Sequence, residues 1–194
     1  MKSTAACFAF LLGSLVLAGP AHADARSDLK AAYGKFIQAN SFRATMTDMD
    51  SGKAMSKIEF LAPDRFAVTP TGGVRQVIIG RMMHIDVGGR TMAIALPAQI
   101  DPGQYRNQKA LEELSAGLSV TQRADSSAAG EPARVYHFVS KAEGEPVQSL
   151  TFVSKASGLP IQIETSGSDG KTSFRLRIRY SHFNDPSIKI AAPK

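Results

Sequence analysis

Methionine and histidine side chains are concentrated in one short segment, where they have the chemistry to bind a metal ion. Met82 and His84 flank Met83, and Met92 follows nearby. Thioether and imidazole groups suit Cu(I), and Met82 and His84 would share one face of a strand because successive side chains point to opposite sides. Methionines are far more common in apolar cores than as copper ligands. We therefore expect core packing and no cofactor, with a copper site as the less favoured alternative.

Catalytic side chains form no recognisable set in this sequence. Beyond residue 23 the histidines are His84, His137 and His182, each isolated in or near a predicted strand, and no serine stands on a strand-turn-helix elbow. The single cysteine, Cys7, lies in the N-terminal leader. Because nucleophile, base and orienting group are all missing, the sequence predicts a protein that is not an enzyme.

Three arginines, Arg175, Arg177 and Arg179, alternate with apolar residues in the last predicted strand. They would share one face of that strand. Such a row could dock onto an anionic membrane or an acidic partner protein. The alternative is the solvated face that every half-buried antiparallel sheet presents. The apolar residues on the opposite face are Phe174, Leu176, Ile178 and Tyr180.

The first residues have the organisation of an export signal. A positive charge precedes an apolar stretch over residues 8–18, and a small-x-small cleavage motif ends at Ala23. Pro20 stands where a bacterial lipoprotein signal has its lipid-bearing cysteine. We therefore expect a signal peptide over residues 1–23, cleavage after Ala23, an unlipidated periplasmic protein and a single domain over residues 24–194.

Charge and composition exclude several partners. The chain has 23 Lys and Arg against 17 Asp and Glu, a net charge of +6 that is scattered along the sequence. No basic run is interleaved with aromatic residues, so we expect no nucleic-acid partner. No stretch after the leader is long and apolar enough to span a membrane. The sequence predicts a monomer, with an anionic membrane or a membrane protein as an open alternative partner.

An amphipathic helix is predicted at the start of the mature chain, over residues 25–39. Its apolar residues, which include Leu29 and Phe36, recur at the spacing of one helix face. Arg26 and Lys30 are placed on the opposite side. Because this apolar face is weak, we expect the helix to act as a lid that can open rather than as a permanent core element.

Alternating apolar and polar residues predict an antiparallel sheet of roughly nine to eleven strands. Gly88-Gly89 forms a two-residue hairpin turn, and the other turns are equally short. A second helix is predicted over 101–116, opened by Asp101-Pro102. The fold class is therefore α+β, mainly β: a curled sheet forming an open half-barrel, with two helices on its concave apolar face. The clearest strand segments are 42–47, 54–61, 74–79, 82–87, 91–96, 134–140, 147–154, 159–165 and 172–180.

Four local motifs and the order of elements resemble the periplasmic lipoprotein-carrier family, which includes the outer-membrane lipoprotein carrier, its acceptor and mycobacterial lipid-binding lipoproteins. The resemblance implies a half-barrel that holds lipid. It also implies a basic residue just before the proline of the first motif, which tethers the helical lid; this chain has Ala62 there, and Arg65 follows the proline. The motifs are residues 60–66, residues 77–80 with 82–97, residues 155–161 and residues 180–184.

The sequence thus favours a carrier or binding protein for a lipid or acylated ligand, such as a lipoprotein, held on the concave face by hydrophobic transfer. A protein-interaction or sensor module of the same fold, which binds a partner through its rim, is the alternative. A fully packed core without a cavity is the structural alternative. The predicted lining residues are Leu29, Phe36, Phe42, Met46, Phe60, Ile78, Leu111, Leu114, Phe174, Leu176 and Ile178.

Overall fold

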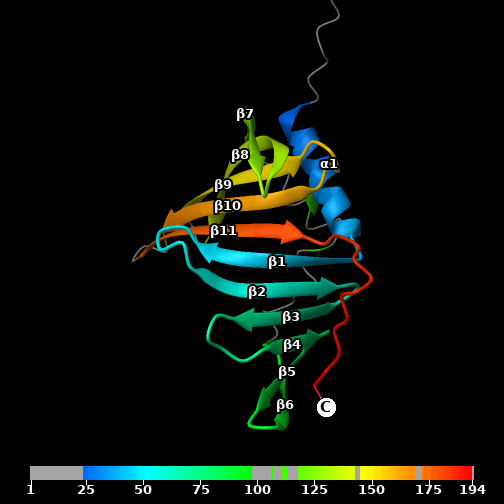
Figure 1. The fold of residues 1–194 in the computed structure, drawn as a ribbon. Coiled ribbons are helices and arrows are strands. Elements are labelled where there is room, and N and C mark those ends of the chain that lie inside the picture. Colours follow the sequence, from blue (N-terminus) through cyan, green and yellow to red (C-terminus); the bar gives the residue numbers. More distant parts are fainter. Residues whose placement is uncertain are drawn as a thin grey trace, which may run out of the picture.

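In the part of the chain that the structure describes, one antiparallel sheet of eleven strands carries the helix α1 across one of its faces (Figure 1). The computed structural model describes residues 24–97, 106, 111–112, 118–142, 145–168 and 172–193. The elements are α1 (Ala25–Gln38), β1 (Ser41–Asp48), β2 (Ala54–Leu61), β3 (Arg65–Pro70), β4 (Gln76–Ile79), β5 (Met82–Val87), β6 (Arg90–Ala95), β7 (Val120–Ala128), β8 (Glu131–Ala142), β9 (Glu145–Ser154), β10 (Pro160–Ser168) and β11 (Ser173–Ser181).

The strands lie in the order β6-β5-β4-β3-β2-β1-β11-β10-β9-β8-β7. Pairing of β1 with β11 joins two meanders side by side, so that β6 and β7 form the two outer edges. A single continuous meander would have placed β6 next to β7. The predicted fold class, a mainly β open half-barrel, is confirmed.

Two strands escaped the sequence analysis for identifiable reasons. β3 is only six residues long, begins shortly after Pro63 and ends at Pro70. Because prolines commonly mark turns, the sequence suggested a bend at this position. β7 is largely polar and exposed, with no apolar alternation along most of its length. The Gly88-Gly89 hairpin is confirmed, since both glycines have positive φ, at 63° and 80°.

The face of the sheet that carries α1, here called the inner face, is set by the register of the central strands. Phe42 pairs with Phe60 across β1 and β2, and Met46 pairs with Ile178 across β1 and β11. Since paired residues share a face, the apolar positions of these strands all point toward the helix side. Two buried clusters form there. One joins Leu29, Ala32, Tyr136, Phe138 and Val153; the other joins Phe42, Ala44 and Phe60, with Phe36, Phe66, Tyr180 and Phe183 packed against them.

The opposite, outer face is covered in part by the C-terminal tail. Ile188 and Ile190 are 1% and 2% exposed and pack on Ala67 and Val77 of β3 and β4. The Arg65 guanidinium donates to the Ile190 carbonyl at 3.0 Å. Arg65 therefore fastens this tail to the outer face.

Two sequence predictions fall largely outside the described residues. These are the signal peptide over residues 1–23 and the second helix over 101–116, of which only Arg106, Leu111 and Glu112 are described. Among the helices that the structure describes, none combines the length and apolar character that a membrane crossing requires.

Candidate functional site

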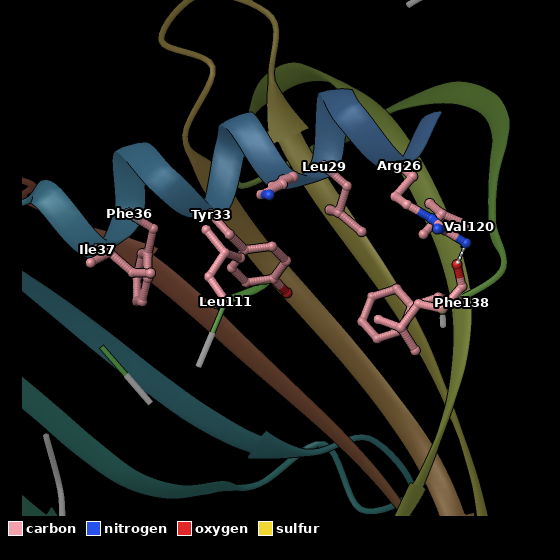
Figure 2. A pocket seen from close by; sticks show the side chains of 10 residues that line it. Arg26, Leu29, Tyr33, Phe36, Ile37, Leu111, Val120 and Phe138 are labelled. Atoms are coloured by element: carbon pink, nitrogen blue, oxygen red, sulfur yellow. Dashed lines mark hydrogen bonds between the residues drawn. The ribbon is translucent and has the colours of Figure 1, made fainter. Parts of the chain in front are cut away.

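An apolar cavity of about 240 Å³ lies between α1 and the strands at the β7 edge of the sheet. Figure 2 shows the side chains of α1 pointing into it from above and Val120 and Phe138 closing it from the sheet. Its wall is almost entirely aliphatic and aromatic. The lining residues are Arg26, Leu29, Lys30, Tyr33, Phe36, Ile37, Leu111, Leu118, Val120 and Phe138.

One stripe of α1 faces this cavity. Arg26, Lys30, Tyr33 and Ile37 follow one another at intervals of three or four residues, which places them on one side of a helix. The sequence analysis put Arg26 and Lys30 on the side of α1 away from the apolar face, and that placement was wrong. The residues of α1 that face the cavity lie beside those that pack on the sheet, Leu29 and Ala32. The two cations, Arg26 and Lys30, are therefore next to apolar residues of the helix.

Polar side chains fasten the first half of α1 to the sheet. One carboxylate oxygen of Asp28 accepts from the Tyr136 hydroxyl at 3.0 Å and from the Arg134 guanidinium at 3.3 Å. Further along the helix, the Tyr33 hydroxyl lies 3.1 Å from the Thr151 hydroxyl. Burial, followed by the hydrogen bond to Asp28, raises the pKa of Tyr136 to about 12. Burial likewise raises the pKa of the Tyr33 phenol.

Arg106 fastens the other end of α1. Its Nη2 donates to the carbonyl oxygens of Phe36, Ile37 and Ala39 at 3.0, 3.0 and 2.9 Å, at the end of the helix, where the Phe36 carbonyl also accepts from the Ala39 N–H at 3.3 Å. A cation is also favoured there by the helix dipole. The guanidinium lies 3.9 Å from the centre of the Phe60 ring and 4.9 Å from that of Phe36. Burial lowers the pKa of Arg106 to about 10.

A second apolar cavity, of about 300 Å³, opens on the other side of Phe36. It lies over the centre of the sheet, and Phe36 and Arg106 form its border with α1. Aromatic rings pack closely along it: Phe36 and Phe42 have ring centres 5.0 Å apart, and so have Phe36 and Tyr180. Burial raises the pKa of the Tyr180 phenol strongly. The remaining lining residues are Ala44, Ile58, Phe66, Val68, Ile78 and Ile178.

Six of the eleven predicted lining residues line one or both of the two cavities. Leu29, Phe36 and Leu111 line the first cavity, and Phe36, Phe42, Ile78 and Ile178 line the second. Phe60 is 1% exposed and lies beneath the Arg106 guanidinium. Met46, Phe174 and Leu176 share the inner face by register but line neither cavity. Leu114 lies outside the described residues.

Several lining residues were missed in the sequence. Tyr33 was on the predicted apolar face of the helix, and Phe138 was in a predicted strand, so their periodicity could have identified both. Val120 belongs to the polar strand β7, where alternation is weak. Arg106 had no local signal, because its partners are about 45 to 70 residues away in sequence.

The candidate metal and catalytic residues are not assembled into a site. Met82 and His84 share a face of β5, but Met92 pairs with Ile85 and so lies on the opposite face. Across the described residues, no group of three or more His, Cys, Asp or Glu side chains could hold a metal ion. His137 lies beside Arg123, with Nδ1 3.4 Å from Nη2, and His182 lies beside Ser181.

The three arginines of β11 are exposed or half-buried on the outer face, and each has a partner there. The Arg175 guanidinium pairs with Asp50 at 3.1 Å and that of Arg177 with Glu164 at 2.8 Å. Arg179 Nε donates to the Gln162 side-chain oxygen at 2.8 Å. These contacts favour the interpretation of a solvated sheet face.

Comparison with solved structures identifies the architecture. LprF from Mycobacterium bovis superimposes with a TM-score of 0.61 over 87% of this chain and 96% of its own, at 13% sequence identity. The chain has the LprF fold. The resemblance to the carrier family is thus confirmed for the fold.

Looser matches are MucB in the MucA/MucB complex of Pseudomonas aeruginosa and a LolA superfamily protein of Nitrosomonas europaea. The first has a TM-score of 0.46 and 18% identity over 89% of this chain and 59% of the matched one. The second has a TM-score of 0.40 and 13% identity over 86% and 96%. No family model and no curated protein matches the sequence.

Proposed function

We propose that this protein is a periplasmic carrier that binds the acyl chain of a lipid or an acylated protein between α1 and the inner face of the sheet, without catalysis. The observation that carries the proposal is the 240 Å³ cavity under α1, whose wall is almost entirely apolar. Apolar cavities of this kind stay dry and take up apolar ligands. The fold shared with LprF and the lipid-holding half-barrel implied by the sequence resemblance support the same proposal.

The size of the cavity limits the ligand. A cavity of about 150 Å³ accepts one benzene ring, so a volume of about 240 Å³ fits part of a single acyl chain rather than several chains. Each methylene transferred from water contributes about 0.8 kcal/mol. A chain that passes Phe36 would continue into the second cavity of about 300 Å³. Phe36 therefore stands where a long chain would have to cross.

Native mass spectrometry of protein purified from the periplasm tests the proposal, because a bound lipid adds its own mass. A displacement assay with a fluorescent fatty acid adds a site-specific test. Val120→Trp fills the cavity and should weaken binding by about tenfold or more, as the ligand loses its space. Val139→Trp is the matched control, since Val139 is 44% exposed on the same part of the sheet and lines no cavity. Equal affinity of the two variants would place the ligand elsewhere.

A partner protein bound on the outer face is the second candidate function. A groove of about 500 Å³ lies on that face over β7 to β11. Phe152 and Val135 form its apolar floor, and its charged lining residues are Arg123, Arg175 and Glu164, of which Glu164 pairs with Arg177. Such a groove suits an acidic segment with apolar side chains. A protein that co-purifies in place of any lipid would favour this candidate.

A further inference from the structure

Two cations without a carboxylate partner stand at the cavity under α1. The Lys30 ammonium has no hydrogen bond or ion pair within the part of the chain that the structure describes. The Arg26 guanidinium donates to the Leu118 backbone carbonyl, which is a neutral acceptor. No acidic residue is among those that line this cavity.

The other cations around α1 are engaged. Arg134 pairs with Asp28, and Lys35 donates to the Ser157 carbonyl at 3.0 Å. Arg106 donates through Nη2 to the last carbonyls of the helix, while its buried Nη1 has no partner among the described residues. Asp28, the acidic residue nearest in sequence to Arg26 and Lys30 within the helix, is itself turned to Arg134 and Tyr136. The positive charge of Arg26 and Lys30 is thus not compensated by Asp28. Each of the two cations stands three positions before an apolar residue of the cavity wall, Leu29 and Tyr33 respectively.

The position of the two charges gives the cavity a direction. Arg26 lies at the end beside Val120 and Phe138, and Ile37 lies at the other end beside Phe36 (Figure 2). Eleven residues of α-helix separate Arg26 from Ile37, a rise of about 16 Å. Among its lining residues, the cavity therefore has a cationic end at Arg26 and an apolar end at Ile37, and the Arg106 guanidinium lies beyond that apolar end, on the last carbonyls of α1.

We propose that the ligand is a single-chain anionic lipid, whose carboxylate or phosphate head group lies at Arg26 and Lys30 and whose chain runs along α1 toward Phe36. This inference rests on the proposed function and names its substrate class. The Arg26 fork can bind either head group through two parallel hydrogen bonds, and Lys30 supplies a compact point charge. Both residues are exposed, so the head group would bind at the mouth of the cavity while the chain lies against the apolar wall.

The experiment compares ligands that share a twelve-carbon chain and differ only in the head group. Dodecanoate, dodecyl phosphate, dodecanol and dodecylammonium displace a fluorescent fatty acid from delipidated mature protein at pH 8 and low salt. We expect the anions to bind about tenfold more tightly than dodecanol, and dodecylammonium to bind most weakly. Tighter binding of dodecanoate would indicate a free fatty acid as the ligand. Tighter binding of dodecyl phosphate would indicate a phospholipid-derived ligand.

The double variant Arg26→Gln/Lys30→Gln should reduce the preference for dodecanoate over dodecanol to about twofold or less. The double variant Lys53→Gln/Lys57→Gln is the control, because it removes the same charge from β2 and its preceding turn without touching the cavity. Equal binding of dodecanoate and dodecanol to the wild type would overturn the head-group inference and leave the proposed function intact. An unchanged preference for dodecanoate over dodecanol in Arg26→Gln/Lys30→Gln would also overturn the head-group inference. Failure of all four ligands, with no lipid found by native mass spectrometry, would instead refute the proposed function.

Discussion

Among the described residues, the inner face of the sheet has one half that is covered by α1 and one half that is open. Under α1, Tyr136 and Val153 of β8 and β9 are 0% and 1% exposed, and the cavity is closed by the helix. At the other edge of the sheet, every residue of β6 is exposed, and Met92 and Ile94 on its inner face are 52% and 42% exposed. The same antiparallel pairing thus supports two very different surfaces.

The difference comes from what lies on the sheet rather than from the strands themselves. Asp28 and Tyr33 lock the first half of α1 onto β8 and β9 by hydrogen bonds. Its last turn is held by Arg106 over the aromatic cluster. The Lys35 bond to the Ser157 carbonyl and the packing of Phe36 on Phe42 and Tyr180 also hold that end. Since Arg106 is the side chain bonded to the last carbonyls, we expect opening of the cavity to begin there once Arg106 is lost. This arrangement sharpens the prediction that α1 acts as a lid.

Removal of a buried side chain from the covered half should have the largest effect. Tyr136→Ala leaves a cavity and removes the Tyr136 hydrogen bond from the Asp28 carboxylate, which keeps its ion pair with Arg134, and we expect it to lower the free energy of unfolding by about 3–5 kcal/mol. Met92→Ala in β6 should change it by less than about 0.5 kcal/mol, because Met92 is half exposed. Urea unfolding followed by circular dichroism measures both values. Equal losses would show that the open half is packed by a contact absent from this structure.

Alkaline pH should destabilise the covered half through its tyrosines. The phenol of Tyr136 has an ordinary pKa near 10 in the unfolded chain and a pKa of about 12 in the folded protein. Between these values the unfolded state binds fewer protons, so the free energy of unfolding falls as the pH rises from 10 to 12. Urea unfolding at pH 8, 10 and 11 measures the slope. Tyr136→Phe should make the slope shallower than in the wild type, and parallel slopes would remove Tyr136 as its cause.

Loss of Arg106 should free the last turn of α1 and leave its first half docked. In Arg106→Met we expect the amides of residues 36–39 to exchange hydrogen about tenfold to a hundredfold faster, as hydrogen bonds from a charged donor are lost. Arg81→Met is the control, since Arg81 donates to carbonyls at the far end of the sheet. If α1 in the wild type is protected as strongly as β11 over residues 174–180, the lid idea fails.

Neutralising the β11 arginines should have the smallest effect. The variant Arg175→Gln/Arg177→Gln/Arg179→Gln removes charges that are each paired on the outer face, and exposed pairs contribute little. We expect binding to phosphatidylglycerol vesicles at low salt to fall by less than about twofold. A larger loss that disappears at physiological salt would restore the prediction of a docking stripe.

The sequence by itself determined the sheet and its orientation. Alternation in β1, β2 and β11 decided which side chains face inward, because a strand has a side-chain period of two. The turn at Gly88-Gly89 could also be predicted from local sequence, since it requires only two adjacent residues that accept positive φ. The apolar face of α1 was visible for the same reason, as its helical period is contained in fourteen consecutive residues.

Tertiary structure alone decided where the sheet is covered and where it holds a cavity. Pairing of β1 with β11 brings residues about 130 apart in sequence into register, and no local pattern encodes this distance. The position of Arg106 over Phe60 likewise depends on contacts between residues far apart in sequence. Arg26 and Lys30 were misplaced because periodicity identifies the stripe of α1 that packs most tightly, whereas the cavity lies beside that stripe. A cavity is a mismatch between two surfaces, so it exists only once both surfaces have been brought together.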